Sequence, residues 1–483
     1  LAASSAPVTT PPSSPSSGAS SGPAAAEPVV PPPPVPGAFR KVLLRGSLFE
    51  LAGYGGSMAM RLGGNILLSR LLFPKAFGLS AEISFVLYGL IMLSDVGIRQ
   101  CVIRSPRGDD PAFVNTAFTM QVLRGVAMTV MGLLAAIPIA RWWFHEPELI
   151  GPLMVASFQQ LVAGFNSTGL LTLRRRLRLG VVNALDLCQQ FLSLVVMVVW
   201  AILYPSVWAL LGGALFGATF LAVTSHLLPV GYRNRFAWDK AAYKELSSFG
   251  RWILGSSSVT FLANQGDRAL FGRFMGAAQL GVYQIAAELA GAAGGIVERL
   301  VGGVLYPALS AKGRDDQPEL RRVYYKSRVG LDLLAQGGLG LLCGVGGWLV
   351  RAVWDSRYWD AAWMLPLLCV RGAISCLVQP TETCMVAMGF SQYGFLRSLA
   401  RGITVWIAIP VGFALGGVPG LLWGVALTEV PALLLLWIPF WRMKMLRLER
   451  ELLAILLFLA ALAVGTMLKH WLPDWHLPHR PRH

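Results

Sequence analysis

The stretch FLSLVVMVVWAILYPSVWALLGGALFGATFLAV, residues 191–223, decides the class of fold. It holds two apolar runs without a charged side chain, on either side of a short turn at 204–206. An apolar helix of about 20 residues satisfies its own backbone hydrogen bonds and can cross the roughly 30 Å of hydrocarbon in a bilayer. Such runs recur from Gly46 to Trp471. The sequence therefore predicts an all-α protein that crosses a membrane many times.

Thirteen membrane helices are predicted from these runs. The chain has 483 residues, of which 55% are hydrophobic and 14% are charged, whereas soluble domains have about 25% charged residues. The connections are too short to hold a large domain outside the membrane. The expected helices are 46–72, 77–98, 114–140, 149–172, 184–204, 206–230, 249–275, 279–305, 329–350, 361–388, 397–415, 418–441 and 452–471.

The positive charges alternate between the two sides of this arrangement. The net charge is +16, and the Arg-rich connections, such as Arg174–Arg178, fall on one side. The opposite connections contain only Lys75, Arg141, Arg351 and Arg357. By the positive-inside rule, the N-terminus and the Arg-rich connections are expected to be cytoplasmic, where they would contact anionic lipids. The charge surplus is thus a topology signal, and we predict no nucleic-acid partner.

The two ends of the chain and its cysteines complete the outline. Residues 1–38 are rich in Pro, Ser and Ala, so we expect a disordered cytoplasmic head and no signal peptide. The six cysteines lie within or beside apolar runs, and they form no CxxC pair and accompany no His cluster. We therefore expect buried cysteines and neither a metal site nor a cofactor.

The two halves of the chain resemble each other at an offset near 203 residues. LLSRLLFPKAFGLSA (67–81) lies over LFGRFMGAAQLGVYQ (270–284), which matches Arg70 with Arg273 and Gly78 with Gly281. Later, VWALLGGAL (207–215) lies over VPGLLWGVA (418–426). Since six helices per half is an even number, both halves would point the same way across the membrane. This predicts two bundles related by a pseudo-two-fold axis along the membrane normal, with a cavity between them.

Several segments carry a recognisable family pattern. Their order and spacing, from about residue 40 to 445, resemble the bacterial polysaccharide exporters, in particular the O-antigen and colanic-acid type flippases of the multidrug/oligosaccharidyl-lipid/polysaccharide exporter superfamily. The segments are RLLFPKAFGL (70–79), LSDVGIRQCVI (93–103), RRRLRL (174–179), SVWALLGG (206–213), SFGRWILGSS (248–257), NQGDRALFGRFMGAAQLGVYQIA (264–286) and LYPALS (305–310).

The resemblance implies two six-helix lobes in a multi-pass protein of the bacterial inner membrane. With the predicted spans, it places the first lobe at 39–230, a cytoplasmic linker at 231–248 and the second lobe at 249–441. Residues 442–483 would add a basic loop, an extra helix and a short tail. The family's function is to flip an undecaprenyl-diphosphate-linked oligosaccharide, such as an O-antigen, capsule or exopolysaccharide unit, to the outer leaflet. A proton or sodium ion and a polysaccharide polymerase are further expected partners.

Ionised side chains inside the predicted helices mark the candidate site. An ion in hydrocarbon is costly unless it lines a wet cavity or finds a partner. Arginine suits a diphosphate because its charge persists and its planar fork donates paired hydrogen bonds. The candidate cavity residues are Arg61, Arg268, Arg124, Arg299 and Asn264, and the candidate coupling or pairing acids are Glu50, Asp267 and Glu288.

Two alternatives remain open at this point. Each arginine could instead pair with a neighbouring acid, for example Arg268 with Asp267, and only hold helices together.

The function could also differ. A multidrug cation antiporter of the same superfamily would need net acid in its cavity, and a polymerase or glycosyltransferase would commonly carry a larger outer loop. Short outer connections and scattered histidines favour a transporter over an enzyme.

Overall fold

The computed structural model describes residues 36–95, 97–176, 178–228, 232–310 and 317–471, with side chains described from residue 53 onward except at 248–253 and 256. The predicted head before residue 36, the tail after 471 and the side chain of Glu50 lie outside the described part. The chain divides into two units, Leu1–Arg45 and Gly46–His483. The helical bundle is the second unit.

Every regular element among the described residues is helical, as expected from the sequence. Short π or 3₁₀ turns lie between the longer helices: η1 (Ile139–Phe144), η2 (Pro147–Leu149), η3 (Val301–Leu305) and η4 (Ser356–Tyr358). The α-helices are α1 (Pro36–Leu71), α2 (Pro74–Leu93), α3 (Ile98–Arg104), α4 (Pro111–Pro138), α5 (Ile150–Gly164), α6 (Gly169–Arg175), α7 (Leu179–Leu203), α8 (Val207–His226), α9 (Lys240–Leu300), α10 (Tyr306–Ser310), α11 (Gln317–Val353), α12 (Ala361–Ala387), α13 (Gln392–Ala426), α14 (Val430–Arg442) and α15 (Leu448–Trp471).

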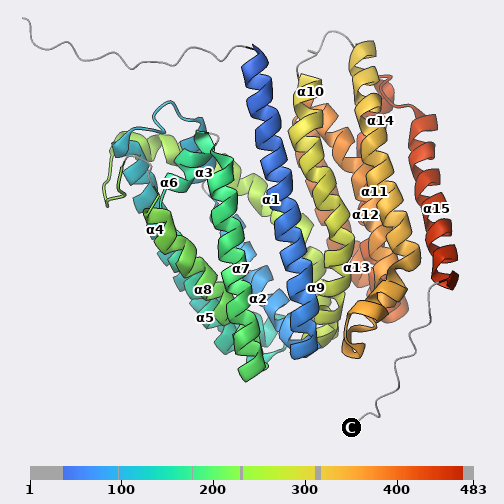
Figure 1. Ribbon diagram of the computed structural model, residues 1–483, viewed down its shortest axis with the longest axis horizontal. Coiled ribbons are helices and arrows are strands. Elements are labelled where there is room, and N and C mark those ends of the chain that lie inside the picture. The colour runs from blue at the N-terminus through green and yellow to red at the C-terminus, as the bar shows by residue number, and fades with distance from the viewer. Residues whose placement is uncertain (1–35, 96, 177, 229–231, 311–316, 472–483) are drawn as a thin grey trace, which may run out of the picture. The chain divides into compact units, whose positions relative to one another are not determined.

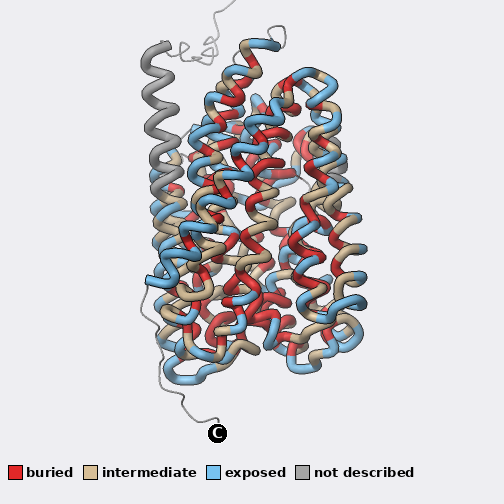
Figure 2. Tube along the Cα trace, turned by 90° about the vertical axis from the view of Figure 1, so that its right-hand side faces the viewer, coloured by how far each residue is buried: buried red, intermediate tan, exposed pale blue. Residues whose placement is uncertain are grey.

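Nine helical segments of the described chain are long and apolar enough to cross a membrane. Large apolar side chains such as Leu203, Leu415 and Leu459 are exposed on the outside of the bundle, where acyl chains would cover them. Figure 2 shows buried residues on the helix faces that look inward and exposed residues on the outer faces. The protein is therefore a multi-pass membrane protein.

Two of these segments contain a reversal of the chain. The segment 257–310 has 54 residues, which would measure about 80 Å as one straight helix. Gly276 breaks it with a φ of 73°, and the hydroxyl of Tyr283 donates to Asp267 Oδ2 at 2.9 Å. In a continuous helix these two residues would lie about 24 Å apart. The chain therefore turns back at Gly276, between the predicted helices 249–275 and 279–305.

A second reversal divides the segment 392–442. Gly417 has a φ of 59°, a conformation that glycine adopts without steric cost. Gly412 and Gly420 lie so close that a Cβ added to either would collide with the carbonyl oxygen of the other. This turn lies where the sequence predicts the boundary between 397–415 and 418–441.

Other boundaries differ from the prediction. The expected helix 149–172 is two helices, α5 and α6, bent by 61°. The polar residues at 166–168 cause the break, since the backbone N–H of Ser167 donates to Ser225 Oγ and not within a helix. Helix α11 starts twelve residues before the predicted 329, because its first turns are helical but polar. Hydropathy alone does not detect such an extension.

Two groups of helices can be distinguished by their contacts. Helix α4 packs on α5 and α7 on α8, while α9 packs on α12 and α13, and α11 packs on α12 and α15. In Figure 1 the green and teal helices α4, α5, α7 and α8 lie together, and the orange and red helices α11 to α15 lie together. The first group belongs to the predicted lobe 39–230, and α9 to α14 belong to the predicted lobe 249–441. The two groups meet chiefly where α2 packs along α9.

Near the turn of α9, the backbones of α2 and α9 approach each other directly, while farther along the helices side chains such as Phe85 and Phe261 fill the contact. A Cβ on Gly78 would collide with the carbonyl oxygen of Ala277, and one on Gly281 would collide with that of Pro74. Gly78 and Gly281 are the glycines that the internal repeat matches. Residues related by a two-fold axis touch each other only near that axis, so this contact is the one that two symmetric lobes would make.

We call the packing of α2 on α9, together with the polar contacts at its end, the α2–α9 seal. The polar contacts join Arg273 to Trp142 and Trp143, and η4 to the end of α1. The Arg273 guanidinium donates to the carbonyl oxygens of Trp142 and Trp143 at 3.0 and 2.8 Å. Arg357 in η4 donates to the carbonyls of Ser69 and Arg70, both at 3.2 Å. These hydrogen bonds therefore join α9 to the turn after α4, and the turn after α11 to the end of α1.

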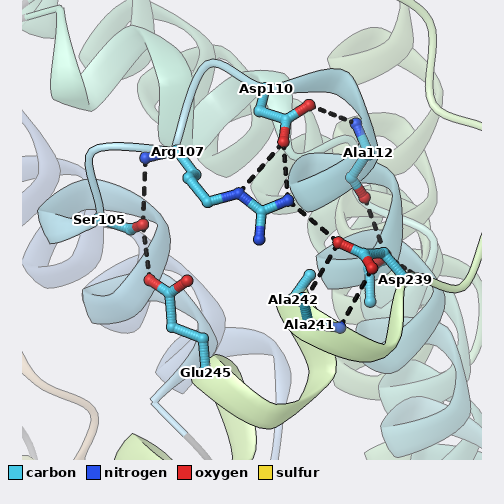
Figure 3. A network of polar contacts seen from close by, with 9 residues as sticks. Ser105, Arg107, Asp110, Ala112, Asp239, Ala241, Ala242 and Glu245 are labelled. Carbon is cyan, nitrogen blue, oxygen red and sulfur yellow. Dashed lines mark hydrogen bonds and ion pairs between the residues drawn. The ribbon is translucent and has the colours of Figure 1, made fainter.

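A polar network fixes the start of α9 at the connection between α3 and α4 (Figure 3). Arg107 Nη2 donates to Asp110 at 2.9 Å and to Asp239 at 3.0 Å, and Ser105 donates to Glu245 at 2.7 Å. Asp239 also caps α9 by accepting from the N–H of Ala241 at 3.1 Å. The hydrogen bond from Arg107 lowers the pKa of Asp239, so the carboxylate stays ionised at neutral pH.

Helix α15, the predicted thirteenth helix, is attached to α11 through a buried ion pair. The side chains of Arg328 and Glu451 are each 1% exposed, and Arg328 Nη2 donates to Glu451 Oε2 at 2.6 Å. Asp332 lies 3.1 Å from Arg328 Nε, and the Tyr324 hydroxyl accepts from Nη1 at 2.9 Å. The guanidinium is therefore surrounded by acceptors.

We expect Gly78→Ala to open the α2–α9 seal, because even a methyl group has no room beside Ala277. The variant should give higher thiol labelling of cysteines placed in this contact and a lower melting temperature. Gly63→Ala is the matched control, since a Cβ there meets nothing within 4 Å. Equal labelling of both variants would contradict a close backbone contact.

Replacing Arg328 by Leu should destabilise the protein by about 3–5 kcal/mol, because Glu451 would remain buried without its partner. Thermal unfolding in detergent measures this. Arg322→Ala is the control, since Arg322 is 79% exposed in its pair with Glu319 and should cost less than about 1 kcal/mol. A similar small loss for both variants would show that the Arg328 pair does not anchor α15.

Candidate functional site

Two adjoining cavities lie between α9, α12 and α13. Their volumes are about 620 and 230 Å³, and both are lined by Asn264, Ser375 and Arg401. The larger cavity extends along the C-terminal part of α9 towards Gly302 and Tyr306, which is the half of the bundle away from the turn at Gly276. We call the two together the α9–α12–α13 cavity.

Ionisable side chains from α9, α12, α13 and the segment after α13 line this cavity. The first half of α9 contributes an acid and the base next to it, and its second half contributes one acid. Helix α12 contributes one base and one acid, and α13 contributes two bases. A further acid lies between α13 and α14. The bases are Arg268, Arg371, Arg397 and Arg401, and the acids are Asp267, Glu298, Glu382 and Glu429.

Most of these charges are matched in pairs across helices. Arg371 Nη1 lies 2.8 Å from Asp267 Oδ2, which also accepts from the Tyr283 hydroxyl at 2.9 Å. Asp267 therefore links both arms of the α9 hairpin to α12. In a medium of low polarity such a pair depends on further hydrogen bonds, and Asp267 accepts one from the Tyr283 hydroxyl and one from the backbone N–H of Arg268.

A second group of pairs joins α12, α13 and the segment after α13. Glu429 is 1% exposed and lies 3.1 Å from Arg401 Nε and 3.8 Å from Arg397 Nη2. Arg397 Nη1 also lies 2.5 Å from Glu382 Oε2, and Arg401 donates to Asn264. Arg397 and Arg401 thus form ion pairs with these acids, and both arginines also line the cavity.

Arg268 differs from the other three arginines. Its Nη1 donates to Gln265 Oε1 at 2.7 Å, and no carboxylate of the described residues lies within ion-pairing distance of its guanidinium. Only its backbone N–H contacts Asp267, at 2.9 Å. The pairing of Arg268 with Asp267 that the sequence left open is therefore not formed by the side chains. Arg268 has a full positive charge on the cavity wall.

The structure separates the predicted residues into groups. Asn264, Asp267 and Arg268 share the α9–α12–α13 cavity. Arg61 instead pairs with Glu288 at 3.8 Å, and Glu288 also accepts from Asn65, so this group joins α1 to the second arm of α9.

The two remaining predicted arginines lie elsewhere. Arg299 lies over the ring of Tyr54, with its Cζ 4.1 Å from the ring centre. Arg124 lines a separate cavity of about 340 Å³ in the first group of helices. Its guanidinium donates to the Ile91 carbonyl at 2.7 Å and to Ser94 at 3.1 Å.

Sequence reasoning missed Arg397, Arg401 and Glu429 as members of the site. The two arginines count as cations of a cytoplasmic connection in the predicted topology, because they begin a predicted helix. They lie four residues apart, and hence on one face of α13. This spacing, together with an acid inside the apolar run at 418–441, is the signal that could have found them.

The fold is similar to that of several solved membrane transporters. The lipid II flippase MurJ in its inward closed conformation superposes with a TM-score of 0.69 over 88% of this chain and 93% of that one, at 10% sequence identity. An inward-facing multidrug resistance MATE family transporter of the MOP superfamily gives 0.62 over 80% and 94%, at 15% identity. These similarities show the fold and confirm the expected all-α transporter architecture.

Sequence relatives come from polysaccharide biosynthesis. The chain is 23% identical to the teichuronic acid biosynthesis protein TuaB of Bacillus subtilis over 62% of each chain. It is 23% identical to the lipopolysaccharide biosynthesis protein WzxC of Escherichia coli, over 75% of this chain and 73% of that one. It is 22% identical to the succinoglycan biosynthesis transport protein ExoT of Rhizobium meliloti, over 77% and 75%.

A family match covers most of the first group of helices and part of the second. Residues 67–363, more than half of the chain, match the family described as polysaccharide biosynthesis protein. The resemblance to polysaccharide exporters that the motifs predicted is confirmed. The chain belongs to the polysaccharide biosynthesis protein family.

Proposed function

We propose that this protein is a flippase that moves an undecaprenyl-diphosphate-linked oligosaccharide across the bacterial inner membrane. Membership of the polysaccharide biosynthesis family and the transporter fold support this proposal. The alignment with TuaB spans 62% of that protein. We take the protein to be a transporter and not an enzyme, and we keep an ion gradient and a polymerase as expected partners.

The observation that carries the proposal is the unpaired guanidinium of Arg268 in an intramembrane cavity. A diphosphate head would supply the anion that Arg268 lacks in this structure, through two parallel hydrogen bonds. Arg401 borders the same cavity and could share the second phosphate, because its guanidinium already lies at the wall beside Asn264.

The size of the cavity fits a headgroup and not a whole glycan. Pockets for small ligands usually measure about 300–1,000 Å³, and the larger cavity alone has about 620 Å³. The diphosphate and first sugars would occupy this space, while the isoprenoid tail stays among the acyl chains. Asn264, Ser375 and Gln379 offer the polar side chains that sugars need.

The positions of seal and cavity support alternating access. The α2–α9 seal lies at the end of the bundle that the positive-inside rule assigns to the outside. The α9–α12–α13 cavity extends into the opposite, cytoplasmic half. In this picture the protein receives its cargo from the cytoplasmic leaflet, and parting of the seal releases the cargo outside.

The paired acids argue against the multidrug alternative. Asp267, Glu382 and Glu429 all contact arginines, so a cationic drug would have to compete with a permanently charged guanidinium. An anion meets no such competition at Arg268. For these reasons we favour a phosphorylated cargo over a cation.

Arg268→Ala should weaken binding of undecaprenyl diphosphate to the purified protein by about 10- to 100-fold, the loss of one charge-assisted hydrogen-bonding group. Titration in nanodiscs with native mass spectrometry or microscale thermophoresis measures this. In cells, the same variant should accumulate lipid-linked repeat units on the inner leaflet and lose surface glycan. Arg61→Ala should also reduce export if that arginine reaches the cargo during the cycle.

Arg442→Ala is the matched control, because Arg442 is an exposed cation of the same lobe outside the cavity. It should bind and export like the wild type. Unchanged affinity in a folded Arg268→Ala protein would reject the site. Tighter binding of an organic cation than of the diphosphate lipid would favour the multidrug alternative.

A further inference from the structure

One buried acid of the seal has no role in the cavity. Glu82 lies in α2 with its residue 0% exposed, and neither carboxyl oxygen has a hydrogen-bond partner among the described residues. The other deeply buried acids, such as Glu451 and Asp267, each contact an arginine. Glu82 therefore differs from these acids in having no arginine partner among the described residues.

The carboxyl group of Glu82 lies between the two lobes. A Cβ added to Gly272 of α9 would lie 3.2 Å from Glu82 Oε1 and 2.6 Å from the ring of Phe144. Three elements thus enclose the group, namely α2, the η1 turn after α4, and α9. A side chain at position 272 would collide with the Phe144 ring and press on the carboxyl group. Separation of α2 from α9 would uncover it.

No described cation forms an ion pair with Glu82. The charged groups that act on it are Lys75 on its own helix and Glu146 from the segment after η1. The Lys75 ammonium is already engaged by Glu148 at 2.8 Å and Glu146 at 3.7 Å. On the α9 side, Arg273 directs its guanidinium to the carbonyls of Trp142 and Trp143.

Isolation of this kind decides the protonation state. An ionised carboxylate that bulk water cannot reach and that has no cation to pair with is so costly that the group takes up a proton instead. Water would surround the same group once the helices part, and a hydrated glutamate is ionised above about pH 4. The closed and open seals therefore bind different numbers of protons.

We propose that Glu82 is a proton-binding site that latches the α2–α9 seal. The carboxylate takes one proton and becomes a neutral acid as the helices close, and it returns that proton to the entering water as they part. Glu82 lies eight residues from Pro74, about 12 Å along the helix from the end of α2. By the positive-inside rule that end is external, so the proton exchanges with the outside.

The sign of the pH dependence follows from this difference in proton number. Since the closed state carries the extra proton, acid favours the closed seal and alkali favours the open one. Linkage of one proton allows the ratio of open to closed molecules to rise by at most about tenfold per pH unit. This inference depends on the proposed function in one respect: the two lobes must move apart, so that α2 separates from α9.

The test measures the seal directly, without any lipid-linked cargo. Spin labels at Tyr204→Cys and Leu415→Cys would report the distance between the lobes, with Cys188→Ser removing the exposed native thiol. Both label positions are exposed. Leu415 lies near the seal, because Phe413, two residues before it, stacks on Phe274 beside the turn at Gly276. Distance distributions would be recorded in nanodiscs from about pH 4 to about pH 9, the range in which hydrated and buried glutamates titrate.

The wild type should shift to the longer distance as the pH rises, by up to about tenfold in population ratio per pH unit. Glu82→Gln, which copies the protonated form, should stay at the short distance at every pH. Glu449→Gln, an exposed acid on α15, should titrate like the wild type. Equal pH dependence of Glu82→Gln and the wild type would overturn the proposal.

A second measurement uses the wild-type fold and covers the case in which Glu82→Gln does not fold. The infrared spectrum of the closed protein at neutral pH should contain the carbonyl band of a protonated carboxylic acid, and Glu82→Asp should move that band. A spectrum without such a band would equally reject the proposal. Failure of the Arg268 test leaves both readouts untouched, because neither uses the cargo.

Discussion

Charge inside an apolar bundle has to be matched where it lies, and this constraint organises most of the second unit of the chain. Arg328 with Glu451 joins α11 to α15, Arg371 with Asp267 joins α12 to α9, and Arg401 with Glu429 joins α13 to the start of α14. Hydrophobic packing cannot by itself align helices that are apolar on all sides in lipid. The ion pairs supply this alignment, since a shifted helix would leave two buried charges without partners.

Two charged side chains are exceptions to this pairing among the residues that the structure describes. Arg268 has a positive charge without a carboxylate, and Glu82 is an acid without a cation. The first borders open space and the second is enclosed, so we propose an anionic ligand for Arg268 and a proton for Glu82. In both proposals the driving force is the same, namely the cost of an unpaired charge in an apolar bundle.

Much of the helical architecture could be predicted from the sequence, because apolar runs of the right length have few other outcomes. The reversals at Gly276 and Gly417 fall between predicted helices, and α15 occupies the predicted 452–471. The break between α5 and α6 could not be predicted, since its polar residues bond to Ser225 on another helix. Hydropathy measures composition along one segment and is blind to such partners.

The site was only partly predictable for the same reason. Asn264, Asp267 and Arg268 lie within two turns of one helix, so their proximity follows from helical spacing. The partners of Asp267 and Glu429 come from residues more than a hundred and about thirty positions away, respectively. Arg61, a candidate cavity residue, lies 3.8 Å from Glu288, a candidate coupling or pairing acid, and nothing in the sequence indicated that these two would meet. The helical spacing of residues in the sequence shows which side chains share one face of a helix. Which residues of other helices contact that face is determined only by the packing of the whole bundle.

The contact of Gly78 with the turn at Ala277 has a mechanical consequence. Interlocked side chains at this point would have to change rotamers each time the proposed seal opened and closed. Backbone surfaces that meet without side chains between them can separate and meet again with no such rearrangement. In the proposed cycle, the opening rate would then depend mainly on the hydrogen bonds beside the contact, chiefly those of Arg273 and Arg357, and substitutions there would change that rate while leaving the glycine contact intact.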